Sequence, residues 1–323
     1  MKIGIDLGGS NLRIALVGEG AALTSTHKEK TGEPRDPESI VERCAKLCEG
    51  LAGSERGISV GIGIAAMLRD REGTVANSPH LRWRDVPFGK LLARRLGSRF
   101  TLGVYNDVNA IVYGESVAGA ARGCRDVLGV YVGTGIGGGL IVDGRMVEGT
   151  TNCAGEIGHT KVRWDDTAEP CACGSRGCVE AYCGGSYIQK RIVRELTAGA
   201  GGAPKSSAVA LAGGIDGINA SHVDQAAAEG DEWALGLWTE IAPLLAVALG
   251  NAVTVLNPDT LLLGGGLLSR TPTLYDLVVT TLMVAGSAPS LEPLRIVQAE
   301  LGDDAGIVGA AHLAASGVSI IAP

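Results

Sequence analysis

The chain is poor in aromatic residues, and no segment of it is strongly basic. Phe, Trp and Tyr together make up 4% of the 323 residues, and the formal net charge is -7. A nucleic-acid surface needs a stripe of Lys and Arg to neutralise phosphates, so DNA and RNA are disfavoured as partners, and we expect neither. A Gly-x-x-x-x-Gly-Lys-Ser/Thr loop is also absent, which excludes the P-loop enzymes.

A long uninterrupted apolar run is missing as well. The apolar start of the chain is broken at Asp6, so we expect no signal peptide, no membrane-spanning segment and no membrane partner. The eight cysteines are therefore predicted to be reduced thiols of a cytoplasmic protein. The sequence does contain 46% hydrophobic residues over a length sufficient for two domains, as a globular protein with a large core requires.

Strand and helix patterns alternate along the chain, which predicts an α/β fold. The predicted strands cover residues 2–7, 12–17, 21–27, 58–64, 101–105, 127–132, 140–142 and 260–263. The predicted helices cover residues 37–51, 87–96, 108–121, 238–255 and about 304–315. The Gly- and Ala-rich stretch 198–204 is predicted to be an exposed loop.

Two glycine hairpins each open one half of the chain and suggest a duplicated domain. The first turns at Gly8-Gly9-Ser10-Asn11 and the second at Gly133–Gly139. Consecutive backbone N–H groups in such turns suit the phosphates of a nucleotide, and Asp6 beside the first turn suits Mg2+ or its water shell. A plain turn with an Asp that bonds its own backbone is the alternative interpretation.

The second hairpin also resembles a dinucleotide-binding fingerprint. Gly133, Gly135 and Gly138 match the pattern G-x-G-x-x-G and follow a predicted strand. That fingerprint requires a helix to begin at its last glycines, so that the helix dipole meets the pyrophosphate. Because a returning strand is predicted here instead, we reject the dinucleotide site.

Three thiols crowd into one short glycine loop at Cys171, Cys173 and Cys178, and His159 lies twelve residues before the first of them. Three thiolates and an imidazole suit tetrahedral Zn2+, and four protein ligands leave no position for a reacting water, so we predict a structural zinc site. Reduced, unligated thiols are the alternative. The isolated cysteines are expected to pack as small apolar side chains: Cys44, Cys48, Cys124, Cys153 and Cys183.

Four polar side chains are candidates for a site that binds a polyol. Asn106-Asp107 follows a predicted strand and precedes a helix, where a helix N-cap is the simpler interpretation. Glu156 lies three residues before His159, and Glu180 follows the cysteine loop. Zinc bound by His159 and the thiols would bring the two glutamates into one region, and sugar hydroxyls need such acceptors.

Five segments occur in the order and spacing of the ROK (repressor, open reading frame, kinase) family, which the chain resembles over nearly its whole length. They are Ile5-Asp6-Leu7-Gly8-Gly9-Ser10-Asn11, Asn106–Ala110, Gly133–Gly139, Gly155–His159 and Cys171–Glu180. The C-x-C-G-x-x-G-C-x-E element of the last segment is highly specific, whereas the glycine hairpins alone are not.

The resemblance implies a two-domain, actin-like ATPase fold of the hexokinase type with the active site in a central cleft. The N-terminal lobe would cover residues 1–115, completed by the C-terminal helix at about 304–323, and the lobe at 116–303 would carry the zinc loop. The implied activity is that of a glucokinase, which transfers phosphate from ATP with Mg2+ to the C-6 hydroxyl of glucose. Similar proteins are typically homodimers or homotetramers.

The resemblance also implies a role for each matched residue, with Asp107 as the catalytic base. The residues that would bind the sugar are Asn106, Asp107, Glu156, His159 and Glu180. The residues that would bind ATP are Asp6, Gly8, Gly9, Ser10, Asn11, Thr134, Gly135, Gly137, Gly138, Gly264, Gly265 and Gly266. The zinc ligands would be His159, Cys171, Cys173 and Cys178.

Three positions depart from the family pattern. Ala65-Ala66 stands where many relatives carry Pro-Gly, His80 stands where they carry Asn, and Ser10 conservatively replaces Thr. The departures at Ala65-Ala66 and at His80 leave the identity of the sugar substrate undetermined among glucose, fructose, mannose, allose and an N-acetylhexosamine. Two other functions are alternatives. One is a polyphosphate-dependent glucokinase, but such proteins generally lack the zinc loop. The other is a non-catalytic sugar-sensing regulator, but the family's repressors carry a helix-turn-helix domain before the first hairpin. Actin-like filament and chaperone ATPases lack the cysteine loop.

Overall fold

The computed structural model describes residues 1–197 and 204–321, and its chain divides into two compact units. Unit 1 comprises Met1–Val127, Gly139–Gly155 and Val297–Pro323, and unit 2 comprises Leu128–Gly138 and Glu156–Ile296. The two ends of the chain therefore belong to the same unit.

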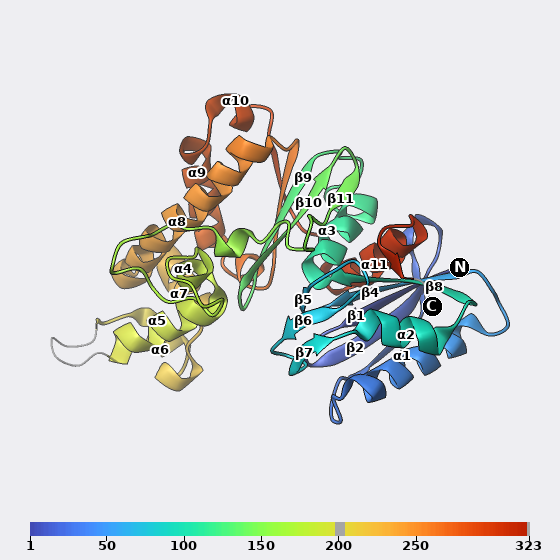
Figure 1. Cartoon of the computed structure of the whole chain (residues 1–323). Coiled ribbons are helices and arrows are strands. Elements are labelled where there is room, and N and C mark those ends of the chain that lie inside the picture. The colour runs from blue at the N-terminus through green and yellow to red at the C-terminus, as the bar shows by residue number, and fades with distance from the viewer. Residues whose placement is uncertain (198–203, 322–323) are drawn as a thin grey trace. The chain divides into compact units, whose positions relative to one another are not determined.

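Unit 1 is built on a six-stranded sheet of order β14-β8-β4-β1-β2-β3, with α1 and α2 on one face and α3 and α11 on the other (Figure 1). The strands of this sheet are β1 (Lys2–Leu7), β2 (Asn11–Val17), β3 (Leu23–Lys30), β4 (Ile58–Ile64), β8 (Phe100–Asn106) and β14 (Ile320–Ile321). The helices are α1 (Pro37–Ala52), α2 (Phe88–Leu96), α3 (Asp107–Ala118) and α11 (Ala305–Ala315). A small sheet of β5 (Met67–Leu68), β6 (Val75–Ser78) and β7 (Trp83–Val86) completes the unit's N-terminal part.

The central strands of unit 1 bury large side chains on one face and carry glycine on the other. Ile3, Ile5 and Leu7 of β1 are fully buried in the core that includes α1. On the opposite face Gly4 of β1 pairs in register with Gly61 of β4. A Cβ at Gly4 would lie 2.1 Å from the carbonyl oxygen of Ile307, and one at Gly61 would lie 1.8 Å from that of Ala310. Glycine therefore allows α11 to pack directly on the backbone of the sheet.

The second sheet has the order β11-β10-β9-β12-β13. Its strands are β9 (Val127–Val132), β10 (Ile136–Val142), β11 (Arg145–Val147), β12 (Thr260–Gly264) and β13 (Arg295–Gln298). Written from its other edge, the first sheet has the order β3-β2-β1-β4-β8-β14. Each sheet therefore begins with a three-stranded meander, β3-β2-β1 or β11-β10-β9, and continues with two later strands, β4-β8 or β12-β13. This shared order agrees with the duplication that the two hairpins suggest.

Unit 2 surrounds its strands with helices. They are α4 (Glu180–Cys183), α5 (Gly185–Thr197), α6 (Ser207–Leu211), α7 (Ala220–Ala228), α8 (Glu232–Leu256), α9 (Pro272–Ala285) and α10 (Ala288–Leu291). Among the described residues, α8 is the one helix that is long and apolar enough to cross a membrane, by length and composition only. Trp238, Ile241 and Leu245 of this helix are buried in the core of unit 2, and a core helix passes the same test.

Most predicted elements are present, several of them with shifted ends, and the helix predicted at 238–255 is the longer Glu232–Leu256. The strand predicted at 21–27 is Leu23–Lys30, and the helix predicted at 108–121 is Asp107–Ala118. The second glycine turn is shorter than predicted, because β10 begins at Ile136 and includes Gly137, Gly138 and Gly139. Of the loop predicted at 198–204, residues 198–203 lie outside the described part of the chain.

Candidate functional site

The first glycine turn lines a surface pocket of about 360 Å3 in unit 1. The predicted phosphate-binding residues in its lining are Asp6, Gly8, Gly9, Ser10 and Asn11. Three charged residues that the sequence analysis did not select, Arg13, Lys28 and Asp303, line the same pocket. The backbone N–H of Gly8 donates to the carbonyl of Asn11 at 3.0 Å, which closes the turn. The structure thus brings together all five phosphate-binding residues that were predicted in and beside the first glycine turn.

Asp6 is paired with a protein cation. It is the cross-strand partner of Arg13, whose Nε and Nη2 donate to Oδ2 of Asp6 at 3.1 and 2.7 Å. Burial raises the pKa of Asp6, while the hydrogen bond and charge of Arg13 lower it. Arg13 also forms an ion pair with Asp303 at 3.2 Å. The carboxylate predicted to serve Mg2+ is therefore part of a three-residue charge network.

Ala65 and His80, which depart from the family pattern, lie in the lining of the same pocket. A Cβ on Gly9 would lie 2.5 Å from Cβ of His80, so only glycine allows the turn to approach this residue. Nη1 of Arg35 donates to the carbonyl of His80 at 2.6 Å, and Oγ of Ser78 donates to the carbonyl of Ala65 at 2.8 Å. Both residues are consequently held beside the predicted phosphate turn.

Asn106 and Asp107 lie at the junction of β8 and α3, as predicted. Oδ1 of Asn106 accepts hydrogen bonds from the N–H groups of Val108 and Asn109, and its Nδ2 donates to the carbonyl of Ala66 at 3.2 Å. Asn106 is therefore the N-cap, and Asp107 is the first helical residue. One amide hydrogen of Asn106 is left for a ligand.

The second glycine turn lines a larger pocket, of about 590 Å3, whose lining lies within unit 2. Gly133 and Thr134 of the turn meet Gly266 and Arg270 there. The first residues of two helices, Gly185–Ser186 of α5 and Ala220–Ser221 of α7, complete much of the lining. The N–H groups of Gly185, Ser186 and Ser221 are already bonded within the protein, but the partial positive charge of a helix N-terminus still favours phosphate.

The other predicted nucleotide-binding glycines occupy different backbone settings. Gly137 and Gly138 lie within β10, and Gly264 is the last residue of β12, so these three belong to strands and not to turns. Gly265 has a φ of 95°, and a Cβ there would lie 2.5 Å from the carbonyl oxygen of Val132. Only glycine fits this position, which directs the chain to Gly266 at the pocket.

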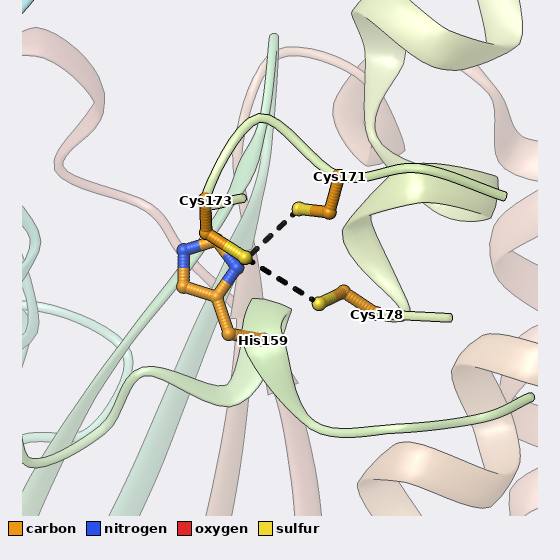
Figure 2. A group of neighbouring side chains, drawn as sticks. All are labelled: His159, Cys171, Cys173 and Cys178. Carbon is orange, nitrogen blue, oxygen red and sulfur yellow. Dashed lines mark hydrogen bonds between the residues drawn. The ribbon is translucent and has the colours of Figure 1, made fainter. Parts of the chain in front are cut away.

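The predicted metal ligands come together in unit 2. The donor atoms of His159, Cys171, Cys173 and Cys178 lie within 4.8 Å of one another, and Figure 2 shows the three sulfur atoms gathered beside the imidazole ring. Nδ1 of His159 is 3.7 Å from Sγ of Cys171, and the sulfur atoms of Cys173 and Cys178 are also 3.7 Å apart. Three sulfurs and one nitrogen form a donor set that suits a tetrahedral metal ion.

Lys161 adds a positive charge beside this group of ligands. Its Nζ lies 2.9 Å from Sγ of Cys178 and donates to Oγ of Ser175 at 2.6 Å. The hydrogen bond with Cys178 raises the pKa of Lys161, which therefore stays protonated at neutral pH. Three thiolates around a divalent ion carry one net negative charge, which the ammonium group of Lys161 compensates.

Glu156 and Glu180 lie at the same group of metal ligands. Oε2 of Glu156 is 3.9 Å from Nε2 of His159, and Oε1 of Glu180 is 4.0 Å from Sγ of Cys171. Burial raises the pKa of Glu156, the charge of Glu180 raises it further, and His159 lowers it. The two glutamates are therefore neighbours, as the zinc hypothesis predicts.

Sequence reasoning missed several residues of both pockets. Arg13 had a usable signal, because a turn over residues 8–11 places residue 13 opposite Asp6 in an antiparallel pair. Ser186, Ser221 and Arg270 are separated by long stretches of sequence, and no local pattern connects them.

The comparisons with known proteins agree over almost the full chain. The model of the ROK family matches residues 2–316. The chain is 32% identical to a glucokinase of Streptomyces coelicolor over 318 residues, 97% of each protein, and 31% identical to an N-acetyl-D-glucosamine kinase of Erwinia tasmaniensis over 330 residues, 97% of this chain and 99% of the relative. A solved ROK family glucokinase of Streptomyces griseus in complex with glucose and AMPPNP is 32% identical, with a TM-score of 0.75 and coverage of 98% of this chain and 99% of the other.

Proposed function

Because this chain belongs to the ROK family and shares its two-domain, actin-like ATPase fold, we propose that it is a glucokinase, which transfers the γ-phosphate of ATP to the C-6 hydroxyl of glucose. The observation that carries the proposal is the similarity over 98% of the chain to a glucokinase that holds both glucose and an ATP analogue. We propose lobes at 1–115 with 304–323 and at 116–303.

The nucleotide phosphates are held by main chain and by positive charge. Phosphoryl transfer depends on alignment and charge neutralisation more than on covalent chemistry. The N–H groups of the two glycine turns donate to phosphate oxygens, and the partial positive charge of the two helix N-termini at the larger pocket attracts the phosphates. Arg13 and Arg270 add positive charge to the two pockets. Mg2+ bound to ATP supplies further neutralisation, and Asp6 is the carboxylate that receives it or its water shell.

The sugar is held by hydrogen-bond acceptors and deprotonated by Asp107. The carboxylates of Glu156 and Glu180 accept from sugar hydroxyls, His159 lies beside them, and the remaining amide hydrogen of Asn106 donates to another hydroxyl. Asp107 takes the proton from the C-6 hydroxyl as its oxygen attacks phosphorus, which requires that hydroxyl within hydrogen-bond reach.

A structural zinc ion braces this part of the site. His159, Cys171, Cys173 and Cys178 would fill its tetrahedral coordination and leave no position for a reacting water. The chain segments that carry Glu156 and Glu180 are adjacent to these ligands, so a bound ion would fix the positions of the two acceptors.

Another hexose is the second candidate substrate. The N-acetyl-D-glucosamine kinase of Erwinia tasmaniensis is 31% identical to this chain, and the glucokinase of Streptomyces coelicolor is 32% identical. Sequence identity alone therefore does not distinguish the two substrates. Ala65 and His80 lie beside the predicted phosphate turn and differ from the common family residues, which gives the choice of sugar a local structural basis.

We further propose that the enzyme acts in the cytoplasm, where ATP is available and thiols stay reduced, and that it forms a homodimer or homotetramer. Val255 of α8 and Val284 of α9 are 81% and 84% exposed, and the hydrogen bond from the N–H of Ser287 to Oγ1 of Thr254 places the ends of these helices together. Exposed apolar side chains on adjacent helices are typical of interfaces between subunits. Light scattering should give a lower molecular mass in solution for the Val255→Glu variant than for the wild-type protein, because the added charge disrupts the interface. An unchanged mass contradicts this interface.

A panel of hexoses tests the proposed function. Formation of the sugar phosphate is measured for the full chain with glucose, fructose, mannose, allose and N-acetylglucosamine, each with ATP and with polyphosphate as the donor, and ADP formation is followed in addition where ATP is the donor. We expect the highest kcat/KM with glucose and ATP, and a product that a glucose 6-phosphate dehydrogenase oxidises. ADP formation that no hexose accelerates contradicts the kinase assignment.

A further inference from the structure

The carboxylate of Glu180 touches both the metal-ligand loop and the second glycine turn. Its Oε2 accepts a hydrogen bond from the backbone N–H of Ile136 at 2.7 Å, while Oε1 lies 4.0 Å from Sγ of Cys171 (the ligands in Figure 2). Ile136 is the first residue of β10, directly after the turn. One side chain therefore joins the segment that the metal ion would brace to the backbone that would hold phosphate.

The turn is shaped to accept this carboxylate. A Cβ on Gly135 would lie 2.4 Å from Oε2 of Glu180, and the three nearest atoms to it all belong to the Glu180 carboxyl group. At Gly133, in the same turn, a Cβ would meet no atom within 4 Å. A methyl group at Gly135 would thus displace the Glu180 carboxylate, whereas one at Gly133 would meet no atom within 4 Å.

Two backbone hydrogen bonds reinforce the same connection. The N–H of Gly185 donates to the carbonyl of Gly133 at 2.8 Å, and the N–H of Ser186 donates to the carbonyl of Thr134 at 2.9 Å. Ser186 also lines the larger pocket. A short segment that starts at Cys178, a proposed metal ligand, therefore bonds to the turn at Gly133, Thr134 and Ile136.

The two oxygens of Glu180 then have separate partners. A carboxylate offers about four lone-pair positions, and the N–H of Ile136 uses one on Oε2. Oε1 stays available to a sugar hydroxyl, the role assigned to Glu180 under the proposed function, on which this step rests. A hydroxyl that fixes the carboxylate also fixes the N–H groups of the turn, and two ligands that order the same element bind with positive cooperativity.

We propose that Glu180 is a positioning residue that couples sugar binding to nucleotide binding through the turn Gly133–Ile136. Sugar on Oε1 holds the carboxylate in the place where Oε2 orients the turn for the phosphates. By reciprocity, the nucleotide increases sugar affinity by the same factor as the sugar increases nucleotide affinity.

Binding titrations of the zinc-loaded protein test this coupling. The Kd of the best hexose from the panel is measured by calorimetry without and with saturating Mg2+-AMPPNP, and the ratio of the two values is the coupling factor. We expect a factor on the order of five or more for the wild-type protein, within the usual range for coupled sites. In Gly135→Ala, where the new methyl group displaces the carboxylate, and in Glu180→Gln, which offers one acceptor oxygen in place of two, the factor should fall close to one.

Gly133→Ala is the matched control. It changes the same turn without contacting Glu180, so its coupling factor should stay at the wild-type value even if its nucleotide affinity changes. Melting temperature and metal content are measured for every variant, because a merely structural role of Glu180 predicts lower stability with unchanged coupling. That result, or a wild-type factor of one in a protein that phosphorylates a hexose, overturns the coupling alone. A wild-type protein that neither binds nor phosphorylates any hexose overturns the proposed function together with it.

Discussion

Asp6 and Arg13 face each other across the first two strands, and Nη2 of Arg13 lies 2.7 Å from Oδ2 of Asp6. The side chains are 26% and 15% exposed, so the pair is largely shielded from water. Burial raises the pKa of Asp6 above its ordinary value, and Arg13, which is connected in turn to Asp303, offsets part of this rise.

Replacing Arg13 should shift the pH dependence of nucleotide use. Burial raises the pKa of Asp6 and Arg13 lowers it, so Arg13→Leu removes the opposing effect and raises this pKa further. The carboxylate that would bind Mg2+ then becomes protonated at a higher pH. We expect the acid limb of kcat/KM for ATP to move to higher pH in Arg13→Leu, with Arg13→Lys closer to the wild type. Superimposable profiles of the leucine variant and the wild type would rule out this role for the pair.

The metal group should carry one zinc ion per chain. Elemental analysis of the purified protein is expected to give a ratio of zinc to protein near one, and Cys173→Ala, which removes one of four ligands, should lower it severalfold. Cys153→Ala is the control, because Cys153 lies outside the metal group and its thiol donates to the carbonyl of Thr151 at 3.3 Å. Equal zinc content in both variants is incompatible with the proposed ligands.

Lys161 should slow the loss of this metal. Its ammonium group compensates the charge of the thiolates through the contact with Cys178, and loss of such a partner typically costs ten- to a hundredfold in metal affinity. With a chromogenic chelator, Lys161→Met should release zinc about tenfold faster than the wild type. Lys205→Met, a change at an exposed residue, should release it at the wild-type rate. If both variants behave alike, Lys161 has no part in holding the ion.

The packing of α11 on the first sheet gives a stability test. A Cβ at Gly61 would lie 1.8 Å from the carbonyl oxygen of Ala310, so Gly61→Ala should lower the free energy of unfolding by about 1–3 kcal/mol or more. Gly50→Ala is the opposite case, because its Cβ would meet no atom within 4 Å and alanine favours the helix by about 0.5–1 kcal/mol. Urea unfolding of the two variants should shift the midpoint in opposite directions. A shift of both in the same direction contradicts the close packing of this helix.

Much of the fold and part of the site could be predicted because short-range patterns determine them. The hairpin at Gly8–Asn11 follows from alternating apolar residues around a turn, and the α1 N-cap follows from Asp36, whose side chain accepts from the N–H of Ser39. The metal group follows from thiol spacing and one histidine. These features depend on residues close in sequence, and the structure places them as expected.

Other features depend on contacts that no local pattern contains. The turn at Gly133 was predicted too long because glycines in a strand look like turn residues. Gly139 is in fact a strand residue that leaves room for α3, since a Cβ there would lie 3.0 Å from Cγ2 of Val112. The larger pocket likewise combines two helices, a turn and the segment Gly266–Thr271 from distant parts of the chain, and the contact of Glu180 with Ile136 joins residues 44 positions apart.

The general base provides the most direct test of the proposed function. The measurement is the steady-state kcat of Asp107→Asn with glucose and ATP, together with the Kd of Mg2+-AMPPNP for the same variant. Asparagine preserves the size of the side chain but cannot accept the hydroxyl proton, so we predict a kcat at least about a hundredfold lower, with the nucleotide Kd within about twofold of the wild type. A variant that phosphorylates glucose at the wild-type rate would contradict the account.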